Sequence, residues 1–239
     1  MRCRKLLIGG GIWALVLLFF WNTLYGRLVD KISTADDLFQ FTSSSVGIQA
    51  PFLHAVAFLM IYLMLVSYFL AGSQIYQLYR MPRRVYTRKL IVSNRWYSLY
   101  FVAVYSIVYS ICILHESSVK LVLDTGFFTT LAFYTGVLAT FYNLFGLVFL
   151  MLSNFLQGRW KGQLITIGIS VTALCIFYFT KLPTPFQGMD VFDMAYYQKS
   201  ILMITYARRI IFNLLLIFVF EYLLLYQVQR KDVVGNEVL

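Results

Sequence analysis

Long, uninterrupted apolar runs separated by short polar stretches are the dominant pattern of this chain. A run of about 20 residues is long enough to cross the roughly 30 Å hydrocarbon core of a bilayer as an α-helix. The runs are continuously apolar, whereas a membrane-spanning strand alternates apolar and polar positions. The pattern therefore predicts an all-α, polytopic integral membrane protein with six transmembrane helices, at residues 6–25, 51–71, 97–115, 127–153, 164–180 and 207–226.

Composition supports a membrane protein, because 60% of the 239 residues are hydrophobic and only 13% are charged. A soluble protein of this size would need more polar surface. The connections are about 25 residues or shorter, below the roughly 50 that an independent domain needs. We therefore expect one transmembrane domain over residues 1–239. The first run follows a basic MRCRK start, as in a secretory signal, but no small-residue cleavage pattern ends it, so we interpret it as a retained span.

The distribution of basic residues predicts the orientation of the spans. Thirteen of the 20 lysines and arginines fall in the N-terminus, the loop 72–96, the connection between the fourth and fifth spans, and the C-terminal tail. The other side holds seven of the ten acidic residues. Because basic loops are retained in the cytoplasm, both termini are predicted to be cytoplasmic and the loop 181–200 external. That loop is polar enough to leave the bilayer but rich in apolar residues, which favours a surface-lying helix, a re-entrant helix or a structured loop.

The loop 72–96 carries the most informative local pattern. Pro82 suits the first turn of a helix, and Tyr86 and Leu90 then share one face of it. Such a short basic amphipathic helix at the inner membrane surface can hold anionic lipid at roughly 1 kcal/mol per basic residue, or act as a lever for a cytoplasmic partner. Nucleic acid is not an expected ligand, because no fold is present to hold a groove reader. The residues assigned to this loop site are Arg80, Pro82, Arg83, Arg84, Tyr86, Arg88, Lys89 and Leu90.

Two short motifs, R-x-P-R-R-x-Y-x-R-K-L at 80–90 and Q-R-K-D-V at 229–233, together with the six-span pattern, give the chain a resemblance to a known family. It resembles the type-2 ABC exporter permeases of Gram-positive bacteria, and among them the small subunits of bacteriocin, lantibiotic-immunity and peptide-export clusters. The resemblance implies that residues 82–90 form the coupling helix that docks on an ATPase subunit. It also implies short helices within 183–198 that dip into the outer leaflet, and a location in the bacterial plasma membrane.

The resemblance further implies several partners and a mechanism. No G-x-x-x-x-G-K-[ST] motif is present, so ATP and Mg²⁺ are expected on a separate ATPase polypeptide and no cofactor on this chain. Six helices form at most half of a translocation pathway in this architecture, so a second permease subunit, identical or related, is expected beside membrane lipids. The cargo would be an amphipathic peptide or a lipid-like molecule. The chain itself would not be an enzyme.

Three ionisable residues fall inside the last apolar run and are candidates for function. Arg208 and Arg209 lie at its outer start, where the side chains either snorkel to the interface or line the mouth of a pathway. Glu221 lies near its inner end, 13 residues from Arg208, so the two cannot pair. The partner of Glu221 must come from another helix, another subunit or water, in a structural or a gating role.

Metal and redox sites are not predicted. His54 and His115 lie near the outer ends of their spans, a pattern found in some haem or metal sites, but no carboxylate cluster accompanies them. Cys3, Cys112 and Cys175 show no C-x-x-C spacing. Two further function classes stay open: a non-transporting immunity or sensor protein, and an intramembrane enzyme, although H-E-x-x-H, G-x-S-x-G and paired intramembrane aspartates are absent.

Overall fold

The computed structural model describes residues 2–25, 32–42, 49–71, 82–156, 158–180, 182–192 and 202–230, and these ranges contain helices and no strand. Six helical stretches in them are long and apolar enough to span a membrane, which confirms the predicted number of apolar spans. They comprise α1 (Arg2–Tyr25), the continuous stretch formed by α3 (Pro51–Leu53), η2 (His54–Phe58) and α4 (Leu59–Ala71), then α6 (Arg83–Glu116), α8 (Phe127–Phe155), α9 (Arg159–Phe179) and α11 (Leu202–Arg230).

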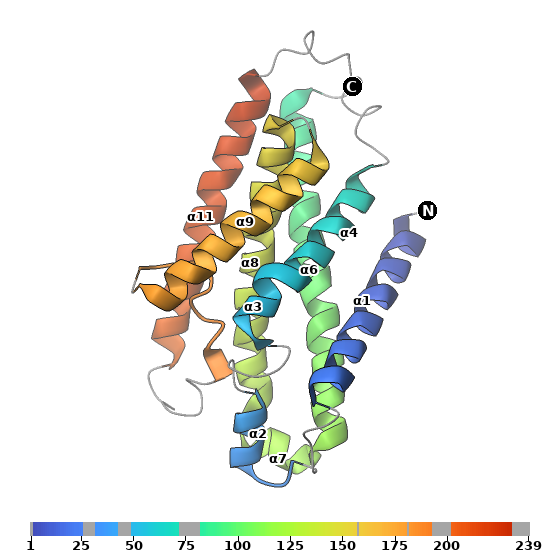
Figure 1. Cartoon of the computed structure of the whole chain (residues 1–239), viewed down its shortest axis with the longest axis vertical. Coiled ribbons are helices and arrows are strands. Elements are labelled where there is room, and N and C mark those ends of the chain that lie inside the picture. The colour runs from blue at the N-terminus through green and yellow to red at the C-terminus, as the bar shows by residue number, and fades with distance from the viewer. Residues whose placement is uncertain are drawn as a thin grey trace.

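The six stretches run up and down in one bundle (Figure 1). We call the end where α1 and α6 begin and α11 ends the terminal end, and the opposite end the loop end. The short helices α2 (Ala35–Thr42) and α7 (Val119–Asp124) lie at the loop end. Helix α8 is the centre of the bundle, because it packs against α6, α9 and α11, and every residue from Phe141 to Leu150 is buried.

Helix α2 shows how a loop-end helix is started. The Thr34 hydroxyl accepts a hydrogen bond from the Asp37 amide at 3.1 Å, and the Asp37 carboxylate accepts one from the Thr34 amide at 2.9 Å. This reciprocal capping satisfies two donors that an isolated helix start leaves unpaired. The side-chain hydrogen bond from Thr34 is the main cause that holds the pKa of Asp37 below its ordinary value.

The second span is not a uniform α-helix. Its first residues, from Pro51, are followed by a π-helical segment, His54–Phe58, before the α-helix continues. A π-helical segment widens the turn and changes which side chains face inward. His54 and Phe58, at the two ends of this segment, are both fully buried.

Helix α6 corrects the expected division between a basic surface helix and a third span. The segment that begins at Arg83 runs without interruption for 34 residues to Glu116, and Pro82 occupies the position before the helix. The sequence between residues 83 and 116 contains no glycine or proline that would end a helix. Asn94 and Arg95, which fell within the predicted loop 72–96, lie inside the helix, and other helices supply partners for them.

The segment 182–192 of the expected external loop is inserted into the bundle. Phe186, Met189 and Val191 are fully buried. Phe186 packs on Phe141 of α8 with ring centroids 5.0 Å apart. The turn in this segment uses Gly188 at a φ of 100°, where a Cβ would lie 3.1 Å from Val137. The described part consists mainly of turns, so among the three alternatives for this loop it fits a structured loop best.

Candidate functional site in the helix bundle

The basic segment expected to contact an ATPase forms the first two turns of α6. Arg84 and Arg88 are exposed, Lys89 and Leu90 are half-buried, and Tyr86 is buried. Arg80 lies outside the described residues, and only the backbone of Arg83 is described. The start of α6 thus presents Arg84 and Arg88 outward and buries Tyr86.

Glu221 obtains its partner from another helix. Both of its carboxylate oxygens accept hydrogen bonds from the Arg95 guanidinium, at 2.6 and 2.7 Å from Nη2 and 3.0 Å from Nε. This bidentate pair joins α11 to α6 in the terminal half of the bundle. Bidentate arginine–carboxylate pairs are stronger and more directional than a single charge contact.

The two arginines at the start of the last span differ in their surroundings. Arg209 donates a hydrogen bond to Asp190 at 2.6 Å, and both side chains are partly buried. Arg208 is exposed. Arg209 therefore ties α11 to the inserted segment 182–192, a contact that neither snorkelling nor a pathway lining had suggested.

A buried polar cluster around Asn94 joins three helices in the terminal half. The Asn94 side-chain oxygen accepts a hydrogen bond from the Tyr62 hydroxyl of α4 at 2.9 Å. Its side-chain amide donates to the side-chain and backbone oxygens of Asn143 in α8, at 2.8 and 2.9 Å. Gly146 provides the space, because a Cβ there would lie 2.0 Å from the Asn94 oxygen. We call Tyr62, Asn94 and Asn143 the asparagine cluster.

A second buried cluster surrounds His54 in the loop half. The imidazole lies between two tyrosine hydroxyls of α8, Tyr142 at 2.7 Å from Nδ1 and Tyr134 at 3.0 Å from Nε2. The Tyr134 hydroxyl also donates to the backbone oxygen of Gln49 at 3.4 Å. The side-chain amide of Gln49 donates to the Tyr109 hydroxyl of α6. We call these five residues the histidine cluster.

One arrangement of protons gives both nitrogens of the His54 imidazole a hydrogen bond. A neutral imidazole has one donor and one acceptor nitrogen. Because the Tyr134 hydroxyl donates to Gln49, it is free to accept from His54 Nε2–H. Nδ1 then accepts from the Tyr142 hydroxyl. His54 is thus accounted for as a neutral residue that joins α8 to η2.

The hydrogen bonds of the two clusters join α4, α6 and α8 at fixed positions along each helix. No aspartate, glutamate, lysine or arginine is among the buried residues of the described ranges. Those ranges also contain no group of three histidine, cysteine or acidic side chains placed to hold a metal. His54 is buried and His115 is exposed, so the two histidines do not form a joint site.

The sequence-based interpretation singled out neither cluster as a site. One available signal was the eight-residue spacing of Tyr134 and Tyr142, which places two tyrosines on one helix face within an otherwise apolar run. Asn143 interrupts the same run. Polar groups inside a span require partners, so these residues mark the inward face of α8.

Comparison of the chain with protein-family models, with curated proteins and with solved structures found no match.

Proposed function

We propose that the chain is the membrane-spanning subunit of an ATP-driven exporter. In this proposal both termini and the terminal end face the cytoplasm, in a bacterial plasma membrane. A separate ABC ATPase docks on the segment 80–90, and a second permease subunit completes the pathway. The cargo is an amphipathic peptide or a lipid-like molecule leaving the cell or the inner leaflet.

The observation that carries this proposal is the continuity of α6. Its basic first turns and its apolar remainder form one helix of 34 residues, about 50 Å long. A force applied to Arg84 and Arg88 would therefore reach the interior without passing through a flexible joint. This is the property that a transmission element requires.

The partners of α6 determine where such a force would act. Asn94 joins α6 to α4 and α8, and Arg95 joins it to α11. A tilt of the basic end of α6 would thus displace α4, α8 and α11 at one level of the bundle. Rigid-body displacement between two packed arrangements is a common mechanism of such transitions.

The inserted segment 182–192 lies at the other end of the proposed pathway. It fills the loop end with buried apolar side chains and is tied to α11 by the Asp190 to Arg209 ion pair. A pathway through this end would be closed in the arrangement described here. Movement of α11 relative to α8 would be needed to open it.

The test compares two pairs of basic residues at the terminal end. Arg84→Gln with Arg88→Gln removes two exposed charges from α6, and Arg159→Gln with Lys161→Gln removes two exposed charges from the start of α9. We expect the ATPase that co-purifies from native membranes to fall about tenfold for the α6 pair, the equivalent of about 1.4 kcal/mol. The α9 pair should retain it.

Three outcomes would contradict the proposal. One is that no ATPase accompanies the wild-type chain. Another is that the α6 and α9 pairs lose the ATPase equally. The third is protection against a toxic peptide that persists when the ATPase is inactivated, which would favour a non-transporting immunity or sensor protein.

A further inference from the structure

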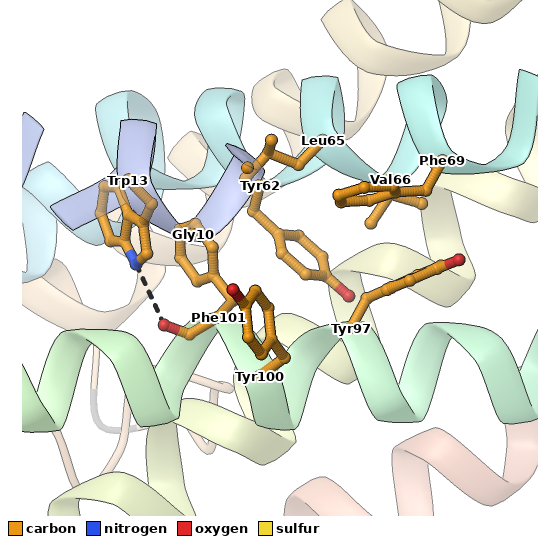
Figure 2. A pocket seen from close by; sticks show the side chains of 10 residues that line it. Gly10, Trp13, Tyr62, Leu65, Val66, Phe69, Tyr97, Tyr100 and Phe101 are labelled. Carbon is orange, nitrogen blue, oxygen red and sulfur yellow. Dashed lines mark hydrogen bonds between the residues drawn. The ribbon is translucent and has the colours of Figure 1, made fainter. Parts of the chain in front are cut away.

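The four tryptophans of the chain fall into two classes. Trp13 and Trp21 are buried, and the indole N–H of Trp13 donates a hydrogen bond to the backbone oxygen of Phe101 at 3.0 Å (Figure 2). Trp96 and Trp160 are 68% and 70% exposed. An exposed indole combines a large apolar area with one N–H donor, which suits the boundary between hydrocarbon and lipid headgroups. The two exposed tryptophans are therefore candidates for the places where α6 and α9 meet the headgroup layer.

The charges beside the two exposed tryptophans differ. The arginine that precedes Trp96 is paired with Glu221 of α11. Trp160 lies between Arg159 and Lys161 in the first turn of α9, where both basic side chains are exposed and no acidic residue is present. The start of α9 thus combines an exposed aromatic ring with two positive charges. We call Arg159, Trp160 and Lys161 the tryptophan site.

Trp160 is the first of a row of exposed apolar side chains along α9. Leu164 follows it by one turn of the helix, and Ile165 and Ile169 continue the row. In a bilayer a row of this kind contacts lipid tails. Trp160 lies about 6 Å nearer the terminal end than Leu164, at the point where the row ends and the basic residues begin. The long side chains of those basic residues can reach outward from there to the headgroups.

The start of α9 is fixed against two neighbouring helices. Gly162 lies so close to α8 that a Cβ there would be 2.3 Å from the Ser153 hydroxyl oxygen, so this approach requires glycine. The side-chain amide of Gln163 donates hydrogen bonds to the Ser67 hydroxyl of α4 at 2.9 Å and to the backbone oxygen of Leu63 at 3.3 Å. The tryptophan site is therefore preformed, which reduces the entropy that is lost when a ligand binds.

We propose that the tryptophan site binds an anionic phospholipid of the leaflet at the terminal end, with the indole at the hydrocarbon boundary and the two basic side chains at the phosphate. A basic residue near an anionic membrane surface contributes about 1 kcal/mol. An acidic soluble protein is the less suitable partner, because the exposed apolar row continues from Trp160 along the membrane-spanning part of α9. The site needs a bilayer but no ATPase, so it does not rest on the proposed transport function.

The experiment uses the full chain in phosphatidylcholine nanodiscs that contain a small fraction of phosphatidylglycerol or phosphatidylcholine brominated near the headgroup, because bromine quenches a nearby indole. Subtracting the fluorescence of Trp160→Phe from that of the wild type isolates Trp160, and Trp96→Phe isolates the control tryptophan in the same way. We expect brominated phosphatidylglycerol to be enriched at Trp160 about fivefold over brominated phosphatidylcholine, the equivalent of about 1 kcal/mol. Trp96 should be quenched equally by both lipids, because Glu221 offsets the charge of the neighbouring arginine.

The basic residues are tested with two pairs of substitutions. Arg159→Gln with Lys161→Gln should abolish the enrichment at Trp160, whereas Arg84→Gln with Arg88→Gln should preserve it. Equal quenching of Trp160 by the two lipids, quenching by aqueous iodide in place of the brominated lipids, or equal effects of the two pairs would overturn the proposal. If Trp160→Phe lowers the melting temperature, Trp160→Tyr replaces it. Because the two pairs are expected to act in the opposite way on ATPase binding, failure of this site is distinguishable from failure of the proposed transport function.

Discussion

Helices α8 and α11 are alike in length and hydropathy but differ in how many of their residues are buried. Each has 29 residues, and the mean hydropathy of their apolar stretches is 1.8 and 2.0. Yet 67% of the residues in that stretch of α8 are buried, against 17% in α11. Hydropathy therefore identifies both as spans but does not tell which one forms the core.

Polar side chains distinguish the two helices. Helix α8 supplies Tyr134, Tyr142 and Asn143 to the buried clusters. In the described part of α11, one buried polar residue, Asn213, donates a hydrogen bond from its side-chain amide to Thr140 of α8 at 3.2 Å. Two ion pairs, of Glu221 with Arg95 and of Arg209 with Asp190, also join α11 to other segments. Helix α11 packs against α8 and α6, and Ile217 and Leu224 of α11 are buried. We infer that α8 is enclosed by packing on all sides, whereas α11 is held by packing on one face together with a few polar contacts.

The largest effect is expected where α8 meets α6. Gly146→Ala would place a methyl group against Asn94, whose amide is held by Tyr62 and Asn143. Overpacking of this kind costs about 1–3 kcal/mol, so the melting temperature in detergent should fall. Gly136→Ala is the control on the same helix, since its Cβ would meet Ile210 of α11 at an ordinary 3.6 Å. Equal melting temperatures for the two variants would remove the proposed difference between the α6 and α11 sides of α8.

A second test addresses the histidine cluster. His54→Leu leaves the Tyr142 hydroxyl without the imidazole as its partner, while Tyr134 keeps its hydrogen bond to Gln49, so a cost of about 1–3 kcal/mol is expected for the one buried group that loses its partner. Adding Tyr142→Phe removes that group, so the double variant should be more stable than the sum of the two single losses predicts. Thermal unfolding of the four proteins gives the coupling energy.

The control for that cycle is His115→Leu, because His115 is exposed at the end of α6. Its melting temperature should match the wild type. Strict additivity of His54→Leu and Tyr142→Phe would indicate that the two side chains do not stabilise the bundle jointly.

The number of spans followed from the sequence because the length of an apolar run is a local property. The ends of the helices were harder to predict from the sequence. Arg95 fell within the predicted loop 72–96. Its place in a helix depends on Glu221, which lies 126 residues away in the chain. Likewise Asn94 depends on Asn143, 49 residues away. Only the assembled bundle brings such partners together. The sequence pattern alone therefore begins the third span too late in the chain, at residue 97, whereas α6 begins at Arg83.

The candidate site was predictable to a smaller extent. Glu221 was recognised as needing a partner from elsewhere, and Arg95 of another helix provides it. The expected role of residues 80–90 stays a prediction. The inserted segment 182–192 was one of several alternatives, because apolar residues in a loop indicate burial without indicating against what. Periodicity likewise did not show that the π-helical turn directs His54 inward.

The smallest effect is expected at the tie between α6 and α11. The side chain of Arg95 is 51% exposed, so removing the ion pair by Glu221→Gln should cost only about 0.5–1 kcal/mol. The change should be smaller at high salt, because screening already weakens an exposed pair. Glu116→Gln is the control, since Glu116 forms no ion pair within the described part of the chain.

The pairing of Arg95 with Glu221, and not the charge of either residue alone, ties α6 to α11. Exchanging the two residues, Arg95→Glu with Glu221→Arg, should restore most of the stability that either single reversal loses. Disulfide trapping of cysteines placed on α6 and α11 then measures the separation of the helices directly. If Glu221→Gln destabilised the protein as strongly as Gly146→Ala, α11 would be part of the core, and the contrast with α8 would fail.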